Sequence, residues 1–163
     1  MNLRLETFLP YRLNRAAAVS SRQFSAIYRD EFGLTVPEWR TLATLGQFGT
    51  ATAKEIGAHS AMHKTKVSRA VSALQKRRWL VRHSDARDRR IEHLSLSAAG
   101  TAAYKRLAPK MLAFEEDLLQ RLSPAEQKAL ATGLAALERA MGIRNRGPQQ
   151  IKSGDLESKQ RVA

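Results

Sequence analysis

The segment from Lys64 to Lys76 has the sequence Lys-Thr-Lys-Val-Ser-Arg-Ala-Val-Ser-Ala-Leu-Gln-Lys, and its pattern is that of a helix with two different faces. Its apolar residues are three or four positions apart, which places them on one side of an α-helix. They are Val67, Ala70, Val71 and Leu74. The residues on the opposite side are Thr65, Arg69, Ser72 and Lys76. We therefore expect a helix with a buried back and a basic, hydroxyl-rich front.

The segments on either side of this helix extend the pattern. A shorter apolar helix is expected at residues 53–58, before a turn that contains serine and histidine. After residue 76 come two short runs typical of strands, which begin at Trp79 and Ile91 and flank a charged tip. Helix, turn, basic helix and basic hairpin in this order predict a winged helix-turn-helix, whose second helix enters the major groove of DNA.

The hairpin and the residues after it carry a more specific motif. It reads Asp85-x-Arg87-Asp88-x-Arg90, followed by Leu94-x-Leu96-Ser97-x-x-Gly100. Together with the basic helix, this motif resembles the signature of the multiple antibiotic resistance regulator (MarR) family, over about residues 9–141. Arg78 departs from it, because the family often has a glycine there to end the helix in a left-handed conformation. The resemblance implies a mostly α protein with a small β-hairpin, in which a winged helix-turn-helix lobe joins a helical dimerisation lobe.

Positive charge is concentrated in the same region. The 163 residues include 28 basic and 15 acidic side chains, which gives a net charge of +13. Between Lys54 and Arg90, eleven basic side chains stand against three acidic ones, a net charge of +8. A generic solvated surface would mix the two signs, so this concentration favours binding to phosphates. A membrane is a less suitable partner, because no basic amphipathic helix has a bulky aromatic face.

We predict that DNA is contacted by basic and hydroxyl side chains of the second helix and of the hairpin, or wing. These are Lys64, Thr65, Lys66, Ser68, Arg69, Ser72 and Lys76 in the helix, and Arg87 and Arg89 in the wing. Arg87 is expected to enter the minor groove. A carboxylate that faced the phosphates would be repelled, so we expect Asp85 to turn inward. In the resembled family, the residue at the position of Arg90 is its partner and braces the wing.

Long apolar stripes flank the winged-helix region. A helix is expected over residues 8–30, stopped by Gly33, and Thr35 begins the next with a capping box to Glu38. Gly46 and Gly49 are expected to bracket a loop. Two later helices are expected to begin at Ser97 and Ser123, each of which is placed as an N-cap. The first contains Pro109, where we expect a kink. The second is expected to end at Gly142.

These stripes are too long for one winged helix to cover. Either the terminal helices fold back on the same chain or they pair with a second chain; in the resembled family they interlock as a symmetric homodimer, which suits a palindromic operator. We therefore divide the chain into an N-terminal dimerisation helix (1–34), a winged helix-turn-helix lobe (35–100), C-terminal dimerisation helices (101–142) and a tail (143–163). Few apolar residues occur in the tail, for which we expect disorder.

Several classes of protein are disfavoured. The chain has no cysteine, so disulfides, thiolate ligands and cysteine-based oxidant sensing are excluded. His59 and His63 are four residues apart, but no carboxylate accompanies them at ligand spacing, so we expect no metal and no other cofactor. Catalytic patterns such as a nucleophile beside a base are lacking, and we expect no enzyme activity. Without an export signal or an apolar run near 18 residues, we expect a cytoplasmic protein.

Two functions remain open. One is a ligand-responsive repressor, released from its operator by a small, anionic aromatic compound; the other is a constitutive DNA-binding or architectural protein. Aromatic and cationic residues near the junction of the two lobes could line a pocket for such a compound, as in similar proteins. They are Tyr11, Arg15, Trp39 and Arg40. The alternative is that Tyr11 and Trp39 are simply core or interface residues.

Overall fold

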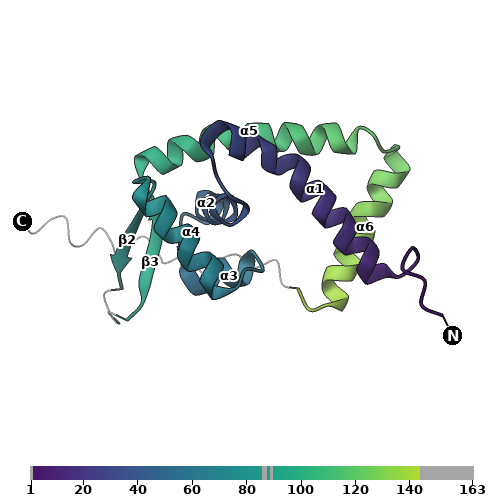
Figure 1. Cartoon of the computed structure of the whole chain (residues 1–163), viewed down its shortest axis with the longest axis horizontal. Coiled ribbons are helices and arrows are strands. Elements are labelled where there is room, and N and C mark those ends of the chain that lie inside the picture. The colour runs from purple at the N-terminus through teal and green to yellow at the C-terminus, as the bar shows by residue number, and fades with distance from the viewer. Residues whose placement is uncertain (1, 86–87, 89, 144–163) are drawn as a thin grey trace, which may run out of the picture.

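The computed structural model describes residues 2–85, 88 and 90–143. This part of the chain is mostly helical, with a small antiparallel sheet, as predicted. In chain order the elements are α1 (Leu9–Phe32), α2 (Val36–Phe48), β1 (Thr50–Thr52), α3 (Ala53–His59), α4 (Lys64–Lys76), β2 (Leu80–Ser84), β3 (Glu92–Leu96), α5 (Ala98–Leu119) and α6 (Pro124–Ala140). In Figure 1, α2, α3, α4 and the sheet form one lobe, α5 runs along its top, and α6 lies at the far end of α5.

Local capping signals set the ends of the helices. The Thr35 hydroxyl accepts a hydrogen bond from the Glu38 amide (3.4 Å), and the Glu38 carboxylate accepts one from the Thr35 amide (2.8 Å), so the predicted capping box is confirmed. The same reciprocal pair begins α6 at Ser123. At the end of α1, Gly33 adopts the left-handed φ of 63°. Each of these signals lies within a few residues of its helix end, which is why the sequence was sufficient to predict them.

The prediction of a loop between Gly46 and Gly49 was wrong for most of its length. Helix α2 continues through Gly46 to Phe48. Close packing explains the glycine at position 46, because a Cβ atom there would lie 2.6 Å from the ring of Tyr104 in α5. Gly49, with φ of 77°, then ends the helix. The next three residues form strand β1, which the sequence analysis missed, since three residues are too few to show an alternating pattern.

Strand β1 turns the predicted hairpin into a three-stranded sheet of order β1-β3-β2. Both pairings are antiparallel, with Ala51 opposite Leu94 and Leu80 opposite Leu96. All four predicted back residues of α4 are buried in the core, where α4 packs against α2, α3 and β2. The core also takes in Tyr28 from α1 and Leu107 from α5, both of which are fully buried.

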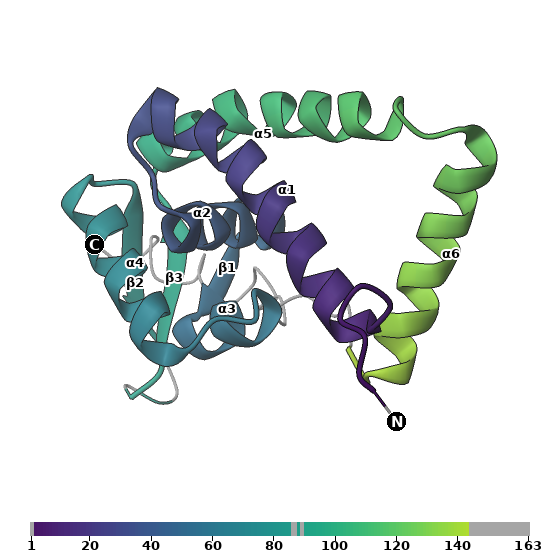
Figure 2. The same ribbon diagram turned by 45° about the vertical axis from the view of Figure 1, so that its right-hand side comes forward.

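The helices outside this lobe keep much of their apolar surface exposed. Helix α5 continues through Pro109 without a break. Figure 2 shows α6 turning away from the end of α5, apart from the sheet and from α4. The large apolar side chains left exposed on the two helices are Leu112, Leu118, Leu130 and Leu134. The described part of one chain therefore does not cover the stripes that the sequence analysis noted. Among the described helices, none is both long and apolar enough to cross a membrane.

Candidate nucleic-acid interface

Helix α4 presents a cationic and polar front to solvent. All seven side chains of α4 that are predicted to contact DNA are exposed. They are Lys64, Thr65, Lys66, Ser68, Arg69, Ser72 and Lys76. No acidic residue occurs in the first turn of α4, and its last turn is basic at Lys76. The front therefore combines positive charge with hydrogen-bond donors on a rigid element, the combination that suits a DNA groove.

The turn before α4 is held from two sides. His63 is the N-cap of α4, and its Nδ1 atom accepts a hydrogen bond from the Thr65 amide (3.4 Å). Arg40 of α2 donates a hydrogen bond to the Ser60 carbonyl (3.2 Å) in the same turn. His59 packs edge-on against the Phe48 ring at 4.9 Å. In the described part of the chain, no cluster of three or more histidine and acidic side chains is arranged to hold a metal ion.

Arg82 joins the wing to α4. From β2, its guanidinium contacts the Glu92 carboxylate of β3 at 2.5 Å and donates to the Gln75 side chain of α4 at 2.9 Å. Three elements thus meet at one planar side chain with several donors. This bridge, which the sequence analysis did not identify, fixes the base of the wing relative to α4.

The carboxylate of Asp85 is turned into the wing. Its Oδ2 atom lies 2.9 Å from Nε2 of His93 on β3, and its Oδ1 atom accepts the Asp88 amide at 3.0 Å. His93 is thus one partner of Asp85, in addition to the Asp88 amide. Arg90 lies in the turn before β3, where its amide donates to the Asp88 carboxylate (2.9 Å), and its pairing with Asp85 stays a prediction. The predicted DNA contacts Arg87 and Arg89 lie outside the described residues.

The structure separates the four residues predicted for a ligand pocket. Tyr11 and Arg15 lie near the start of α1, with the guanidinium 5.8 Å from the ring centre. Trp39 instead stacks on Tyr28, with ring centres 5.6 Å apart and nearly parallel planes. Tyr28 lies near the other end of α1, about 25 Å along the helix axis from Tyr11, and its burial raises the pKa of its hydroxyl. Within one chain these residues do not form one pocket.

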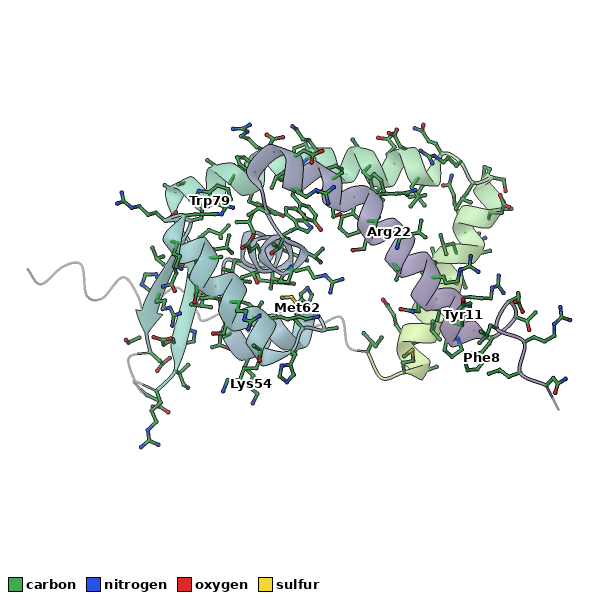
Figure 3. All side chains as sticks on the ribbon, in the orientation of Figure 1. Phe8, Tyr11, Arg22, Lys54, Met62 and Trp79 are labelled. Atoms are coloured by element: carbon green, nitrogen blue, oxygen red, sulfur yellow. The ribbon has the colours of Figure 1, made fainter. Side chains whose placement is uncertain are left out.

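A different cavity, of about 490 Å³, lies between α3, α4 and the sheet. Its walls are mostly apolar, with Met62, Val67, Val71 and Leu94 among the lining residues. Three cationic side chains also line it, Lys54, Lys64 and Arg82, together with Glu92. Figure 3 shows Lys54 and Met62 at the α3 end of this region. The lining residues come from four elements, so no single stretch of sequence indicated the cavity.

The buried apolar back of α4, its cationic front, the preceding α3 and the antiparallel wing define a winged helix-turn-helix DNA-binding protein. Comparison with known proteins shows which family this region resembles. A MarR family model matches residues 32–91, and a helix-turn-helix transcriptional regulator of Bacillus subtilis, YwoH, is 26% identical over 123 residues, which cover 76% of this chain and 88% of the relative. In sequence and fold, the chain is therefore similar to the DNA-binding transcriptional regulators of the MarR family.

Solved structures agree with this assignment. A MarR family regulator from Silicibacter pomeroyi is 26% identical, with a TM-score of 0.72 over 90% of this chain and 99% of the other. The fold is also shared by Sco3205 from Streptomyces coelicolor, determined in complex with DNA, at 21% identity and a TM-score of 0.75 over 86% and 90% of the two chains. At 20% identity and a TM-score of 0.70, it is shared by NadR in complex with 4-hydroxyphenylacetate, over 84% and 96% of the two chains.

Proposed function

We propose that this protein is a repressor that binds a palindromic operator as a homodimer and is released by a small, anionic aromatic molecule. The observation that carries the proposal is the front of α4, where seven exposed polar or cationic side chains stand opposite a fully apolar, buried back. Of these, Arg69 offers the fork of donors that suits the edge of a guanine. Lys66 and Lys76 offer point charges that suit phosphates.

The proposed dimer rests on the uncovered apolar side chains of the helical lobe. Leu130 and Leu134 of α6 are 43% and 47% exposed, and Leu112 of α5 is 64% exposed. An exposed stripe of this kind marks an interaction surface. Because a symmetric dimer presents two copies of α4 related by a twofold axis, its natural target is a palindrome with matching half-sites.

The proposed effector site is the cavity between α3, α4 and the sheet. Its apolar walls suit an aromatic ring, and Lys54 and Lys64 at the cavity suit a carboxylate, while Arg82 is already paired with Glu92. Lys64 and Ser68 belong both to this cavity and to the DNA-facing front. A bound acid would therefore compete with DNA for the same side chains. That NadR was determined with an aromatic acid supports this class of ligand.

DNA binding is tested with a duplex selected by the protein itself from a random pool. Arg69→Ala should weaken binding by about 1–3 kcal/mol if Arg69 contacts a guanine. Arg22→Ala, which removes the same charge from an exposed position of α1 (Figure 3), serves as the matched control and should bind normally. Equal affinities of the two variants for the duplex would contradict the proposal that α4 contacts the bases.

The effector part is tested separately, by a thermal-shift screen of aromatic carboxylic acids followed by measurement of DNA release. An acid that raises the melting temperature should release DNA, and Lys54→Ala should weaken the effect of that acid. A regulator that binds DNA equally well with and without every acid would instead be the constitutive DNA-binding protein considered above.

A further inference from the structure

Arg77 follows directly after the recognition helix α4, within the most basic part of the sequence. Its charge would ordinarily be counted among those available to phosphates. In the structure, however, its guanidinium is turned to the end of α1: Nη1 donates a hydrogen bond to the Phe32 carbonyl (2.7 Å) and Nη2 donates one to the Gly33 carbonyl (3.1 Å). These two contacts join residues that lie 45 and 44 positions apart in the sequence.

The end of α1 is well suited to accept this side chain. Gly33 is left-handed; its amide donates to the Arg29 carbonyl (2.7 Å), and the Leu34 amide donates to the Tyr28 carbonyl (3.2 Å). In this arrangement the last carbonyls of the helix are left to find partners elsewhere. Since the carboxyl end of a helix also carries partial negative charge, a guanidinium is a favourable partner for them.

The contact continues from α4 through α1 into α5. The Arg77 guanidinium lies 5.4 Å from the centre of the Trp79 ring, and the Phe32 ring meets Trp79 edge-on at 5.1 Å. The Arg106 guanidinium of α5 also lies over the Phe32 ring, 4.8 Å from its centre. Arg106 also contacts the Glu31 carboxylate at 2.5 Å, so α5 holds the same last turn of α1 that Arg77 holds from α4.

We propose that Arg77 is a positioning residue: it fixes the angle of the recognition helix to the helical lobe and thereby sets the half-site spacing that the dimer can read. This inference rests on the proposed function, namely DNA binding by α4 in a dimer. Two parallel hydrogen bonds from one rigid fork restrict rotation as well as distance. One inserted base pair moves the half-sites apart by about 3.4 Å and rotates them by about 35°. A rigid pair of recognition helices cannot follow that rotation without strain in the protein or the DNA.

A direct phosphate contact by Arg77 predicts a different behaviour. Losing a phosphate contact lowers the salt dependence of affinity by about 0.9 per contact, and it weakens all spacings equally. Arg77→Lys would then resemble the wild type, because the charge is kept. If Arg77 acts as a fork, Arg77→Lys loses one of the two bonds and resembles Arg77→Ala, while the salt dependence stays unchanged in both.

The experiment uses the full chain and a duplex that it selects from random DNA, together with versions of that duplex with one base pair inserted or removed at the centre. Salt titrations are run on the wild type, Arg77→Ala, Arg77→Lys and, as the phosphate-contact control, Lys76→Ala. Wild type and Lys76→Ala should bind the selected duplex about tenfold or more tightly than the duplexes with altered spacing. For both Arg77 variants this ratio of affinities should fall below about threefold, while the salt dependence of affinity stays unchanged.

Unchanged discrimination in both Arg77 variants, or a lower salt dependence in Arg77→Ala alone, would overturn the inference and leave the proposed function intact. A wild type that selects no duplex would overturn the proposed function and this inference together. If Arg77→Ala does not fold, Arg77→Lys alone decides the question, because it keeps the charge and the length of the side chain.

Discussion

Replacing Gly46 by alanine tests how closely α2 and α5 pack, and the structure allows the effect to be estimated. A new Cβ would lie 2.6 Å from three ring atoms of Tyr104, roughly 1 Å inside an ordinary contact. Overpacking of this kind costs about 1–3 kcal/mol, whereas alanine gains about 1 kcal/mol over glycine within a helix. The net result should be a loss of up to about 2 kcal/mol in the free energy of unfolding.

Gly133 provides the matched control, because it also lies inside a helix but has no atom within 4 Å of its added Cβ. Gly133→Ala should gain about 1 kcal/mol, so the two variants should differ by about 1–3 kcal/mol. Urea unfolding at one fixed protein concentration measures both. In the Gly46→Ala background, Tyr104→Ala should cost less than in the wild type, since it removes the clash. If Gly46→Ala stabilises as much as Gly133→Ala, the close packing described here is wrong.

Three further predictions concern association, the wing and pH. Leu134→Asp should shift the protein towards monomer in sedimentation velocity, because it places a charge in the proposed apolar interface; an unaltered dimer would mean that α6 is not part of it. Asp85→Ala should weaken DNA binding although it removes a negative charge, since the wing loses its contact with His93; tighter binding at matched salt would show that the wing acts only through its charge. Hydrogen bonds from Lys110 and Arg106 hold the pKa of Glu31 below its usual 4.5. When the protein unfolds below about pH 4.5, Glu31 therefore takes up a proton. The free energy of unfolding should fall as the pH drops through that range, and Glu31→Gln should flatten this part of the plot of melting temperature against pH.

The features that the sequence predicted correctly depend on neighbouring residues. The starts of α2 and α6, the stop at Gly33 and the buried back of α4 all follow from residues within one or two turns of each other. Even Arg78, which lacks the family's glycine, adopts the left-handed φ of 59° that the glycine would supply. The end of the recognition helix is therefore preserved despite this substitution, although an arginine reaches that conformation at some cost.

The features that it missed depend on partners far away in the chain. Gly46 was taken for the start of a loop because Tyr104, which requires the glycine, comes 58 residues later. Arg77 looked like one more cation beside the DNA, since its carbonyl partners belong to a helix that ends more than 40 residues earlier. Tyr11 and Trp39 were grouped as ligand residues by their chemistry, and within one chain the length of α1 keeps them apart.

The shared core has a consequence for how this chain could be cut or recombined. Tyr28 of α1 and Leu107 of α5 are fully buried in the same cluster as Leu42, Ile56 and Leu74 of the winged helix. A fragment restricted to residues 35–100 would lack both side chains and would leave their apolar neighbours exposed to water. The winged helix-turn-helix lobe is therefore not a module that gene fusion could transfer to another protein by itself. A functional exchange between relatives would have to carry the end of α1 and the first half of α5 along with it.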